Sequence, residues 1–244
     1  MIRVGVLGAL GRMGAEVCRA VIADPETALV AAIDPRAAGE KITVSDGGTI
    51  VVSDEIDTLS QAEADVAVDF THPDAVMDDV RWCVRHAMHC VVGTTGLGDT
   101  DLDAIRALID EEGNESNVFV APNFAIGAVL MVRFAAAAAR HFPHVEIIEM
   151  HHDGKADAPS GTALATARIR DLARGGTLEG ISIHSIRLPG LVAHQEVILG
   201  SPGQTLTIRH DSVERSSFMP GVLLAVKNIQ RHPGLTIGLE TLLD

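Results

Sequence analysis

Basic residues are scarce in this chain of 244 residues. Lys and Arg together number 19, against 33 Asp and Glu, and the formal net charge at pH 7 is −14. Proteins that bind along nucleic acid neutralise phosphates with clustered Lys and Arg, so this composition argues against a nucleic-acid partner. Any anionic partner is therefore expected to be small and bound locally.

Long apolar runs are missing as well. No uncharged apolar run approaches the ~20 residues needed to cross a bilayer, and residues 1–8 lack the regions of a secretory signal. Three cysteines without CxxC spacing favour buried thiols in a reducing cytoplasm over a disulfide framework. Neither HExxH nor a Cys/His metal spacing is present. We therefore expect a cytoplasmic protein with no membrane partner and no metal centre.

The N-terminal residues read as a strand, a glycine turn and a helix. Residues 2–7 are apolar and rich in β-branched side chains, and a helical pattern runs to about residue 23. The turn between them has GxxGxxG spacing, which lets the backbone approach a pyrophosphate at the start of the helix. GxxGxxG is less common than GxGxxG, so the turn alone is a moderately specific signal for NADH or NADPH. The turn residues predicted to bind the cofactor are Gly8, Ala9, Leu10, Gly11, Arg12 and Met13.

A second strand, residues 28–33, ends in Asp34. An acid at this distance from the glycine turn can accept hydrogen bonds from an adenosine ribose. An acid before Pro35 also serves as a plain turn residue, and the glycine turn favours the ribose interpretation. Arg12 and Arg36 are both candidates to meet a 2′-phosphate, so the sequence does not choose between NADH and NADPH.

Strand and helix patterns alternate after a poorly periodic stretch, residues 35–60, which we expect at the surface. The alternating segments are residues 65–70, 73–87, 89–92, 100–112 and 118–121. This alternation predicts an α/β fold with a Rossmann-like, doubly wound parallel sheet and helices on both faces. Ligands collect at the carboxyl ends of such strands, so three strand-end loops are predicted to wall the nicotinamide end. Their cofactor-binding candidates are Phe70, Gly93, Thr94, Thr95, Ala121, Pro122, Asn123 and Phe124.

The pattern changes after residue 125. Residues 126–140 read as a helix buried on most sides. A strand at 144–150, a helix at 160–174 and three β-like runs at 182–188, 194–199 and 204–210 follow. No helix is left to link these runs, so we expect an inserted α+β domain with a mixed or antiparallel sheet and helices on one face. A symmetric partner is the simplest cover for the other face.

The last segments return to the first domain. A helix near residues 220–230 and a strand at 235–240 complete the nucleotide-binding sheet in this interpretation. The predicted domains are residues 1–125 plus 216–244 for dinucleotide binding, and 126–215 for substrate binding and oligomerisation. The crossings near Ala125 and Ser216 are natural hinges.

Proton donors lie beside an anion site in residues 149–163, EMHHDGKADAPSGTA. His151, His152 and Lys155 can carry positive charge or deliver protons. Ser160 begins a helix, whose first N–H groups attract carboxylates or phosphates, although a Ser here can also be only a helix cap.

This stretch resembles the signature of the 4-hydroxy-tetrahydrodipicolinate reductase (dihydrodipicolinate reductase) family of diaminopimelate and lysine biosynthesis. Further similar stretches span nearly the whole chain, namely VLGA at 6–9 with Gly11 and Gly14, DFTHP at 69–73, VGTTG at 92–96, APNFAIG at 121–127 and AHQEV at 193–197.

The resemblance implies an NAD(P)-binding domain, a domain that binds a small dicarboxylate substrate, and a homotetramer assembled through the second-domain sheets. It makes His151 and Lys155 the proton donors, and which of the two delivers the proton stays open. Around the substrate carboxylates it places His152, Lys155, Ser160, Gly161 and Thr162. Residues 173–180 are short for a loop that elsewhere might cover the site.

Two other functions stay open. One is a dehydrogenase of another aspartate-derived metabolite with the same two-domain plan, which the His-His-x-x-Lys and Ser-Gly-Thr pattern argues against. The other is a non-catalytic NAD(P) sensor, which has no use for paired proton donors beside an anion site.

Overall fold

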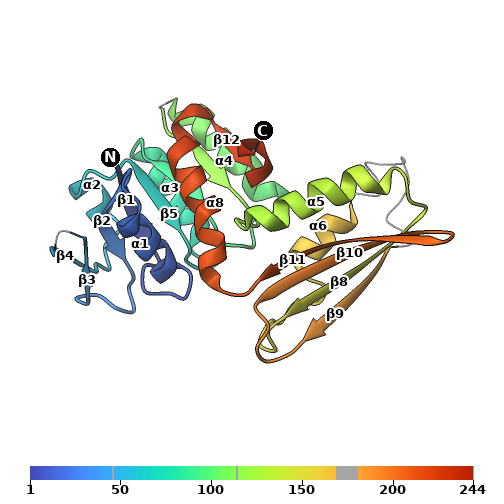
Figure 1. The fold of residues 1–244 in the computed structure, drawn as a ribbon. Helices are drawn as coiled ribbons and strands as arrows, with labels where there is room; N and C mark the ends of the chain where they lie inside the picture. The colour runs from blue at the N-terminus through green and yellow to red at the C-terminus, as the bar shows by residue number, and fades with distance from the viewer. Residues whose placement is uncertain (46, 114, 169–180, 244) are drawn as a thin grey trace. The chain divides into compact units, whose positions relative to one another are not determined.

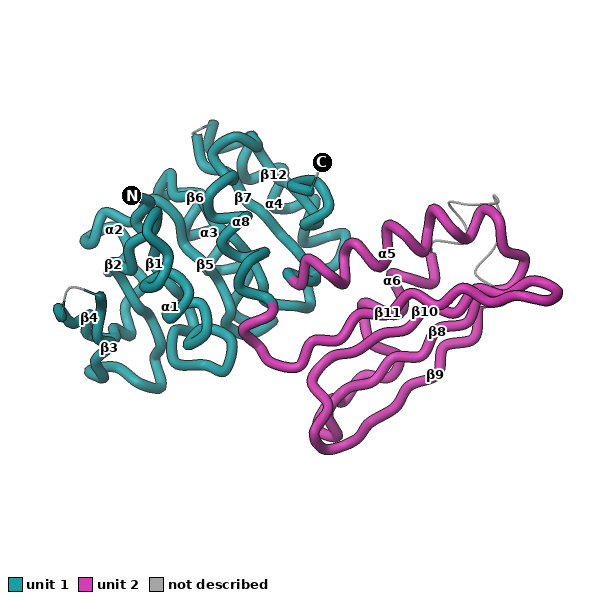
Figure 2. Tube along the Cα trace, viewed as in Figure 1, with its two compact units in different colours: residues 1–124, 218–244 teal, residues 125–217 magenta. Residues whose placement is uncertain are grey.

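The computed structural model describes residues 1–45, 47–113, 115–168 and 181–243. It divides into two compact units (Figure 2): unit 1 combines Met1–Phe124 with Phe218–Asp244, and unit 2 is Ala125–Ser217. The sequence division places the crossings after residues 125 and 215, within two residues of these points. The binding roles assigned to the two units stay predictions.

Parallel strands form the main sheet of unit 1 (Figure 1), in the order β12-β7-β6-β5-β1-β2 over the described residues. The chain starts at β1 and pairs it with β2 on one side and β5 on the other. Strand order therefore reverses at β1, and in open α/β sheets the carboxyl ends at such a reversal are where ligands bind. The bounds are β1 (Ile2–Leu7), β2 (Thr27–Ile33), β5 (Val66–Asp69), β6 (His89–Val92), β7 (Val118–Val120) and β12 (Leu235–Ile237).

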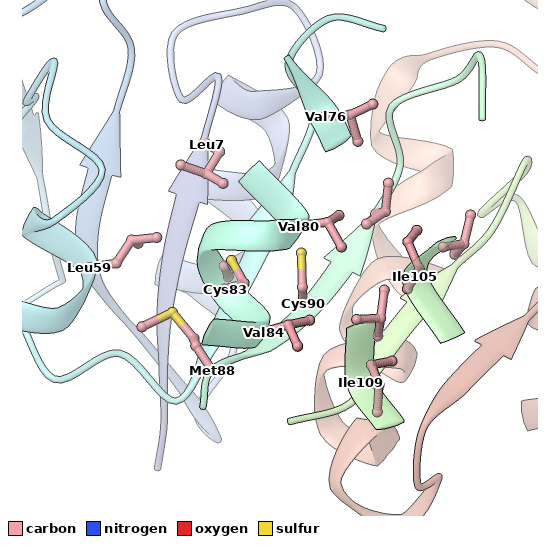
Figure 3. Packing of buried hydrophobic residues seen from close by; sticks show 14 of the residues in the cluster. Leu7, Leu59, Val76, Val80, Cys83, Val84, Met88, Cys90, Ile105 and Ile109 are labelled. Atoms are coloured by element: carbon pink, nitrogen blue, oxygen red, sulfur yellow. The ribbon is translucent and has the colours of Figure 1, made fainter. Parts of the chain in front are cut away.

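Helices cover both faces of this sheet, as the predicted Rossmann-like fold requires. Helix α1 packs with α8, and α3 packs with α4 (Figure 1). Strand residues alternate between the two sides: Cys90 and Val92 of β6 join the core beneath α3 and α4 (Figure 3), while Val91 lies outside that cluster. Burial of both faces explains why these strands read as continuous apolar runs. The helices are α1 (Gly14–Ala23), α3 (Val76–Arg85), α4 (Asp99–Glu112) and α8 (Met219–Asn228).

The stretch at residues 35–60 contains more structure than its weak periodicity indicates. Strands β3 (Lys41–Thr43) and β4 (Thr49–Val51) form an antiparallel hairpin, and α2 (Thr58–Gln61) follows. Each strand has only three residues, which is too short to give an alternating pattern. The last strand is also shorter than predicted, because Gly238 with φ of +87° ends it. Short 3₁₀ helices η1 (Arg215–Phe218), η2 (Ile229–Arg231) and η3 (Leu239–Leu242) flank these C-terminal elements.

Unit 2 has a mixed sheet, as predicted, in the order β11-β10-β8-β9 over its described residues. Strand β10 is antiparallel to both β8 and β11, whereas β9 runs parallel to β8. Helices α5 and α6 share one apolar core with the sheet face that carries Ile147, Val197 and Leu199. The bounds are α5 (Ile126–Ala139), β8 (His144–His151), α6 (Gly161–Ala167), β9 (Ser182–Arg187), β10 (Ala193–Ser201) and β11 (Gln204–Ser212).

Helix α5 corrects one prediction. It is not buried on most sides: its buried residues, Ala128, Met131, Ala135 and Ala139, form a single stripe, and Phe134 is 57% exposed. The apolar run over 135–139 is mostly alanine, which favours helix through propensity and does not by itself require burial. The predicted helix at 160–174 begins as expected, but its part at 169–174 and the short segment 173–180 lie outside the described residues.

Candidate active site

The glycine turn after β1 is held by close backbone contacts. Gly8 has φ of +74°, and a Cβ there would lie 2.5 Å from the carbonyl oxygen of Phe70. A Cβ on Gly14 would lie 2.0 Å from the carbonyl oxygen of Gly8. Gly11 N–H donates to that same oxygen at 3.0 Å. The turn therefore tolerates only glycine at its first and last positions, and α1 begins directly behind it.

A cavity of about 590 Å³ opens at the carboxyl ends of the unit 1 strands, a volume within the range of small-molecule and cofactor sites. The glycine turn and all three predicted strand-end loops contribute to it. Of the predicted cofactor-binding residues it is lined by Gly11, Arg12, Met13, Phe70, Gly93, Thr94, Thr95, Ala121, Pro122, Asn123 and Phe124. Arg36, the second candidate to meet a 2′-phosphate, also lines the cavity, and the structure adds Thr71, Pro73 and Phe218.

Four predicted residues, Gly8, Ala9, Leu10 and Asp34, are outside this lining. The Asp34 carboxylate accepts hydrogen bonds from the backbone N–H groups of Leu10 and Arg36, both at 3.1 Å. It therefore acts as the turn acid that the sequence offered as the alternative, and its contact with a ribose stays a prediction. Ala9 is fully buried, so only its backbone is suited to a ligand contact.

Aromatic rings supply the apolar part of the cavity wall. The ring centroids of Phe70 and Phe124 are 6.0 Å apart, in a tilted arrangement. A Cβ on Gly93 would lie 2.2 Å from Cζ of Phe70, so this glycine leaves the space that the ring occupies. Aromatic side chains beside backbone N–H groups and the two arginines Arg12 and Arg36 suit a molecule that joins aromatic rings to phosphates. The cavity therefore fits a nicotinamide dinucleotide.

In unit 2, Glu149 of β8 holds the centre of a buried polar cluster. Its carboxylate is 0% exposed and accepts two hydrogen bonds from Arg187 of β9, at 2.7 and 2.9 Å. It also pairs with Nδ1 of His151 at 2.5 Å and accepts the backbone N–H of Ser160 at 3.2 Å. Arg187 additionally donates to the carbonyl oxygen of Asp157 at 2.6 Å. One carboxylate thus connects two strands, the following loop and the start of α6.

The electrostatic environment of this cluster keeps the Glu149 carboxylate ionised and favours the neutral form of the His151 ring. Burial opposes ionisation of Glu149, but hydrogen bonds from Arg187, Ser185 and His151 outweigh it and lower its pKa to about 2. Burial lowers the pKa of His151, and Lys155 and Arg187 add to this, while Glu149 acts in the opposite direction. A neutral His151 that donates Nδ1–H to Glu149 keeps Nε2 as its second, unprotonated nitrogen.

The other predicted substrate residues follow on the same loop. Lys155 Nζ lies 2.7 Å from Oδ1 of Asp157, and its side chain is 24% exposed. Ser160 is the N-cap of α6, because its hydroxyl accepts the N–H of Ala163 at 3.2 Å. His152 is half-buried, and Gly161 and Thr162 form the first turn of α6. The structure therefore gathers the predicted catalytic and substrate-binding residues on one strand end and one helix start.

Two residues of the cluster have roles that sequence reasoning missed. Glu149 belongs to the quoted signature but carries no role there, and Arg187 lies 36 residues after His151 in the chain. The parallel pairing of β8 with β9 puts His151 opposite Arg187. Glu149 could have been found from the sequence, because it is an acid two residues before His151 and therefore lies on the same face of the strand. For Arg187 no local signal existed.

The described residues contain neither a metal centre nor a membrane-spanning helix. No group of three His, Cys, Asp or Glu side chains is arranged as metal ligands among them. Over the same part of the chain, no helix is both long enough and apolar enough to cross a membrane. Cys18, Cys83 and Cys90 are buried free thiols, as the sequence predicts.

A parallel sheet with a glycine turn, joined to a unit with a mixed sheet, defines the class: a nicotinamide-dependent oxidoreductase. Comparison with known proteins identifies the family. The N-terminal model of dihydrodipicolinate reductase matches residues 2–124, and the C-terminal model matches residues 127–243. The chain belongs to the dihydrodipicolinate reductase family.

Individual relatives agree over full length. The chain is 48% identical to the 4-hydroxy-tetrahydrodipicolinate reductase of Mycolicibacterium gilvum over 99% of both chains, and 48% identical to that of Nocardia farcinica over 100% of this chain and 99% of the relative. A dipicolinate-bound dihydrodipicolinate reductase from Paenisporosarcina sp. TG-14 is 39% identical, with a TM-score of 0.84 over 99% of each chain. An aspartate semialdehyde dehydrogenase from Vibrio cholerae has a TM-score of 0.63 but 10% identity over 95% of this chain and 99% of that one, so it shares only the fold.

Proposed function

We propose that the chain reduces 4-hydroxy-tetrahydrodipicolinate to tetrahydrodipicolinate with NADH or NADPH, a step of diaminopimelate and lysine biosynthesis. The observation that carries this proposal is the cluster of His151, Lys155 and the α6 start, located on the signature of a family whose full-length relatives bear this activity in their name. The overall reaction takes up one hydride and one proton and releases the hydroxyl group as water. A bound NADH or NADPH supplies the hydride.

The loop before α6 is proposed to hold the two carboxylates of the substrate. Lys155 and His152 offer side-chain donors, and Gly161 and Thr162 form the first turn of α6, whose N–H groups are proposed to face the substrate. The backbone N–H of Ser160 is taken by Glu149. The Ser160 hydroxyl caps α6 through Ala163, so its part in binding is to fix the direction of that turn. A small dicarboxylate is consistent with the dipicolinate bound by the relative from Paenisporosarcina.

Lys155 is proposed to deliver the proton, and His151 to orient and assist it. The pKa of His151 is lowered, so near neutral pH this ring holds no spare proton, and its Nδ1–H is engaged by Glu149. Lys155 carries three donor hydrogens, and its partner Asp157 is more than half exposed. Release of a proton by Lys155 leaves an amine that solvent can recharge, so the site can return to its starting state.

For the cofactor, the proposed contacts follow the cavity wall. The backbone of the glycine turn and the start of α1 would hold the pyrophosphate, and the strand-end loops would hold the nicotinamide. Arg12 and Arg36 both line the cavity, so the planar guanidinium of either residue can donate hydrogen bonds to a 2′-phosphate. Replacing Arg36 with Ala should weaken NADPH binding by about tenfold while changing NADH binding little.

A homotetramer in the cytoplasm completes the proposal. The outer face of the unit 2 sheet carries Ile148, Met150, Ile186 and Ile198, which are partly exposed. A second copy of the chain is the proposed cover for this face. Sedimentation of the wild type and of Ile198→Asp should give a tetramer and a smaller species, respectively.

The function is tested by supplying the product of the preceding synthase and following nicotinamide absorbance with NADH and NADPH in parallel. Oxidation of either cofactor that depends on both substrate and enzyme is expected. A dehydrogenase of another aspartate-derived metabolite would instead reduce NAD(P)⁺ with an alcohol or aldehyde. A non-catalytic sensor would bind the cofactor in the same preparation and give no turnover.

A further inference from the structure

Two carboxyl groups meet behind the strand-end loops of unit 1. Asp69 is the last residue of β5 and is fully buried. Its Oδ1 accepts hydrogen bonds from the N–H of Thr71 at 3.0 Å, from the hydroxyl of Thr71 at 2.9 Å and from the hydroxyl of Thr94 at 2.5 Å. Thr71 and Thr94 both line the cavity. Asp69 therefore ties two walls of the proposed cofactor site together.

Asp79 of α3 approaches the same place. Its carboxyl is within hydrogen-bond reach of Asp69, and its Oδ2 lies 3.2 Å from the hydroxyl of Thr71. The hydroxyl of Thr71 has one hydrogen and lies beside two carboxyl oxygens, Asp69 Oδ1 and Asp79 Oδ2. It can donate that hydrogen to only one of them. The other oxygen of Asp69, Oδ2, is buried and accepts no hydrogen bond within the described part of the chain. The second Thr71 contact and Asp69 Oδ2 both lack a donor hydrogen, and a protonated Asp79 supplies one to this group of oxygens.

The surroundings favour a neutral Asp79. Burial raises the pKa of Asp79 to about 7, the charge of Asp69 and the hydrogen bond with it add to this, and Asp78 contributes a little more. The core cluster of unit 1 contains the thiols of Cys83 on α3 and Cys90 on β6 (Figure 3), and the charges of Asp69 and Asp79 act on Cys90. The pKa of Cys90 is raised well above its usual value by its hydrogen bond with Cys83 and by burial, so the Cys90 thiol stays uncharged.

We propose that Asp69 and Asp79 share one proton, and that this shared proton positions Thr71 and Thr94 for binding of the nicotinamide cofactor. Loss of the proton puts two negative charges side by side behind the cavity wall. Their repulsion separates the loop after β5 from α3 and brings additional negative charge next to a site for a polyanion. Cofactor affinity then falls as the pH rises through the neutral range. This inference rests on the proposed cofactor site, and it makes Asp69 and Asp79 positioning residues.

Binding of NADH to the full-length chain as a function of pH tests the proposal. NADH is the probe, because the 2′-phosphate of NADPH titrates itself at about pH 6. Wild-type affinity should fall by about tenfold between roughly pH 6 and pH 8.5, as linkage to one proton allows. Asp79→Asn keeps the shape of the side chain and donates a hydrogen that does not titrate. Its affinity should stay at the wild-type low-pH value across the range.

Asp78→Asn is the matched control, since it removes the same charge from the neighbouring, exposed residue of α3. Its affinity should still fall with pH as in the wild type, with a slight shift toward lower pH because Asp78 adds to the raised pKa of Asp79. A profile for Asp79→Asn that falls like the wild type, or a flat wild-type profile, overturns the proposal. Should the chain bind neither NADH nor NADPH at any pH, the proposed function fails instead.

A second measurement uses the wild type alone, in case Asp79→Asn does not fold. The side-chain carboxyl ¹³C shifts of the aspartates are followed by NMR against pH. One carboxyl of the pair should titrate near neutral pH, and its partner well below that. Titration of both groups at the ordinary aspartate pKa of about 3.9 would overturn the shared proton.

Discussion

Arg187 and Glu149 form a two-point ion pair between parallel strands, with Nη2–Oε1 and Nη1–Oε2 distances of 2.7 and 2.9 Å. Glu149 is fully buried and the Arg187 side chain is 17% exposed, so neither charge is left to solvent. Pairs in this environment are costly to break, because removing one partner leaves the other charge uncompensated. The pair also fixes the acceptor to which His151 donates.

Replacing Glu149 with Gln should separate two effects of this pair. Stability should fall by about 3 kcal/mol because Arg187 stays buried without a counter-charge. The kcat should fall roughly 10- to 100-fold because His151 loses its orienting acceptor. The double variant Glu149→Gln/Arg187→Met should recover much of the stability but not the activity, as measured by urea unfolding and steady-state kinetics. Recovery of both would mean that Glu149 has only a structural role.

The same carboxylate predicts an acid-sensitive contribution to stability. The folded pKa of Glu149 is lowered to about 2 from an ordinary value of 4.5. Its stabilisation is therefore fully present above about pH 4.5 and is lost as the pH falls toward 2, with a total on the order of 3 kcal/mol. Urea unfolding at a series of acidic pH values should show this slope in the wild type. The slope should be weaker in the double variant, and an equal slope in both proteins would contradict the assignment.

Replacing His151 or Lys155 with Ala should reduce turnover by about 100-fold or more, because each removes a group proposed to act at the substrate ring. NADH affinity should stay within about twofold, since the cofactor cavity lies within unit 1. His144→Ala is the control: this histidine is exposed and begins β8, the strand that His151 ends. Full activity in either test variant would remove that residue from the proposed mechanism.

Gly14→Ala should abolish cofactor binding. The added Cβ would lie 2.0 Å from the carbonyl oxygen of Gly8, a rigid backbone atom, so the glycine turn must open. Gly200→Ala, on β10, adds the same methyl group where no atom lies within 4 Å, and it should behave as wild type. Fluorescence titration with NADH measures both. Normal binding by Gly14→Ala would show that the turn does not form the pyrophosphate site.

Local patterns predicted much of unit 1. Strand β1 and the start of α4 come from apolar runs and turn residues that act within a few positions of the chain. The three strand-end loops were grouped correctly because parallel strands bring their carboxyl ends to one edge of a sheet. The hairpin of β3 and β4 was not predicted, because strands of three residues are too short to show an alternating apolar and polar pattern.

What the sequence could not supply were contacts that depend on register. Arg187 meets Glu149 only because β9 pairs in parallel with β8 at a particular offset, and no local pattern specifies that offset. Asp79 comes close to Asp69 because α3 packs against β5, and no local pattern specifies that packing. The exposed side of α5 was missed for a related reason: an alanine-rich helix has the same composition whether one or both of its sides are covered.

The bonds of Glu149 to His151 and to the backbone of Ser160 have a consequence for the evolution and engineering of this family. The Glu149 side chain both orients the His151 ring and fixes the first turn of α6, which is proposed to bind the substrate carboxylates. A substitution that adapts the turn to a larger or differently charged substrate therefore also changes the acid–base behaviour of the ring. Redesign of specificity at this site should start from residues that Glu149 does not contact, such as His152.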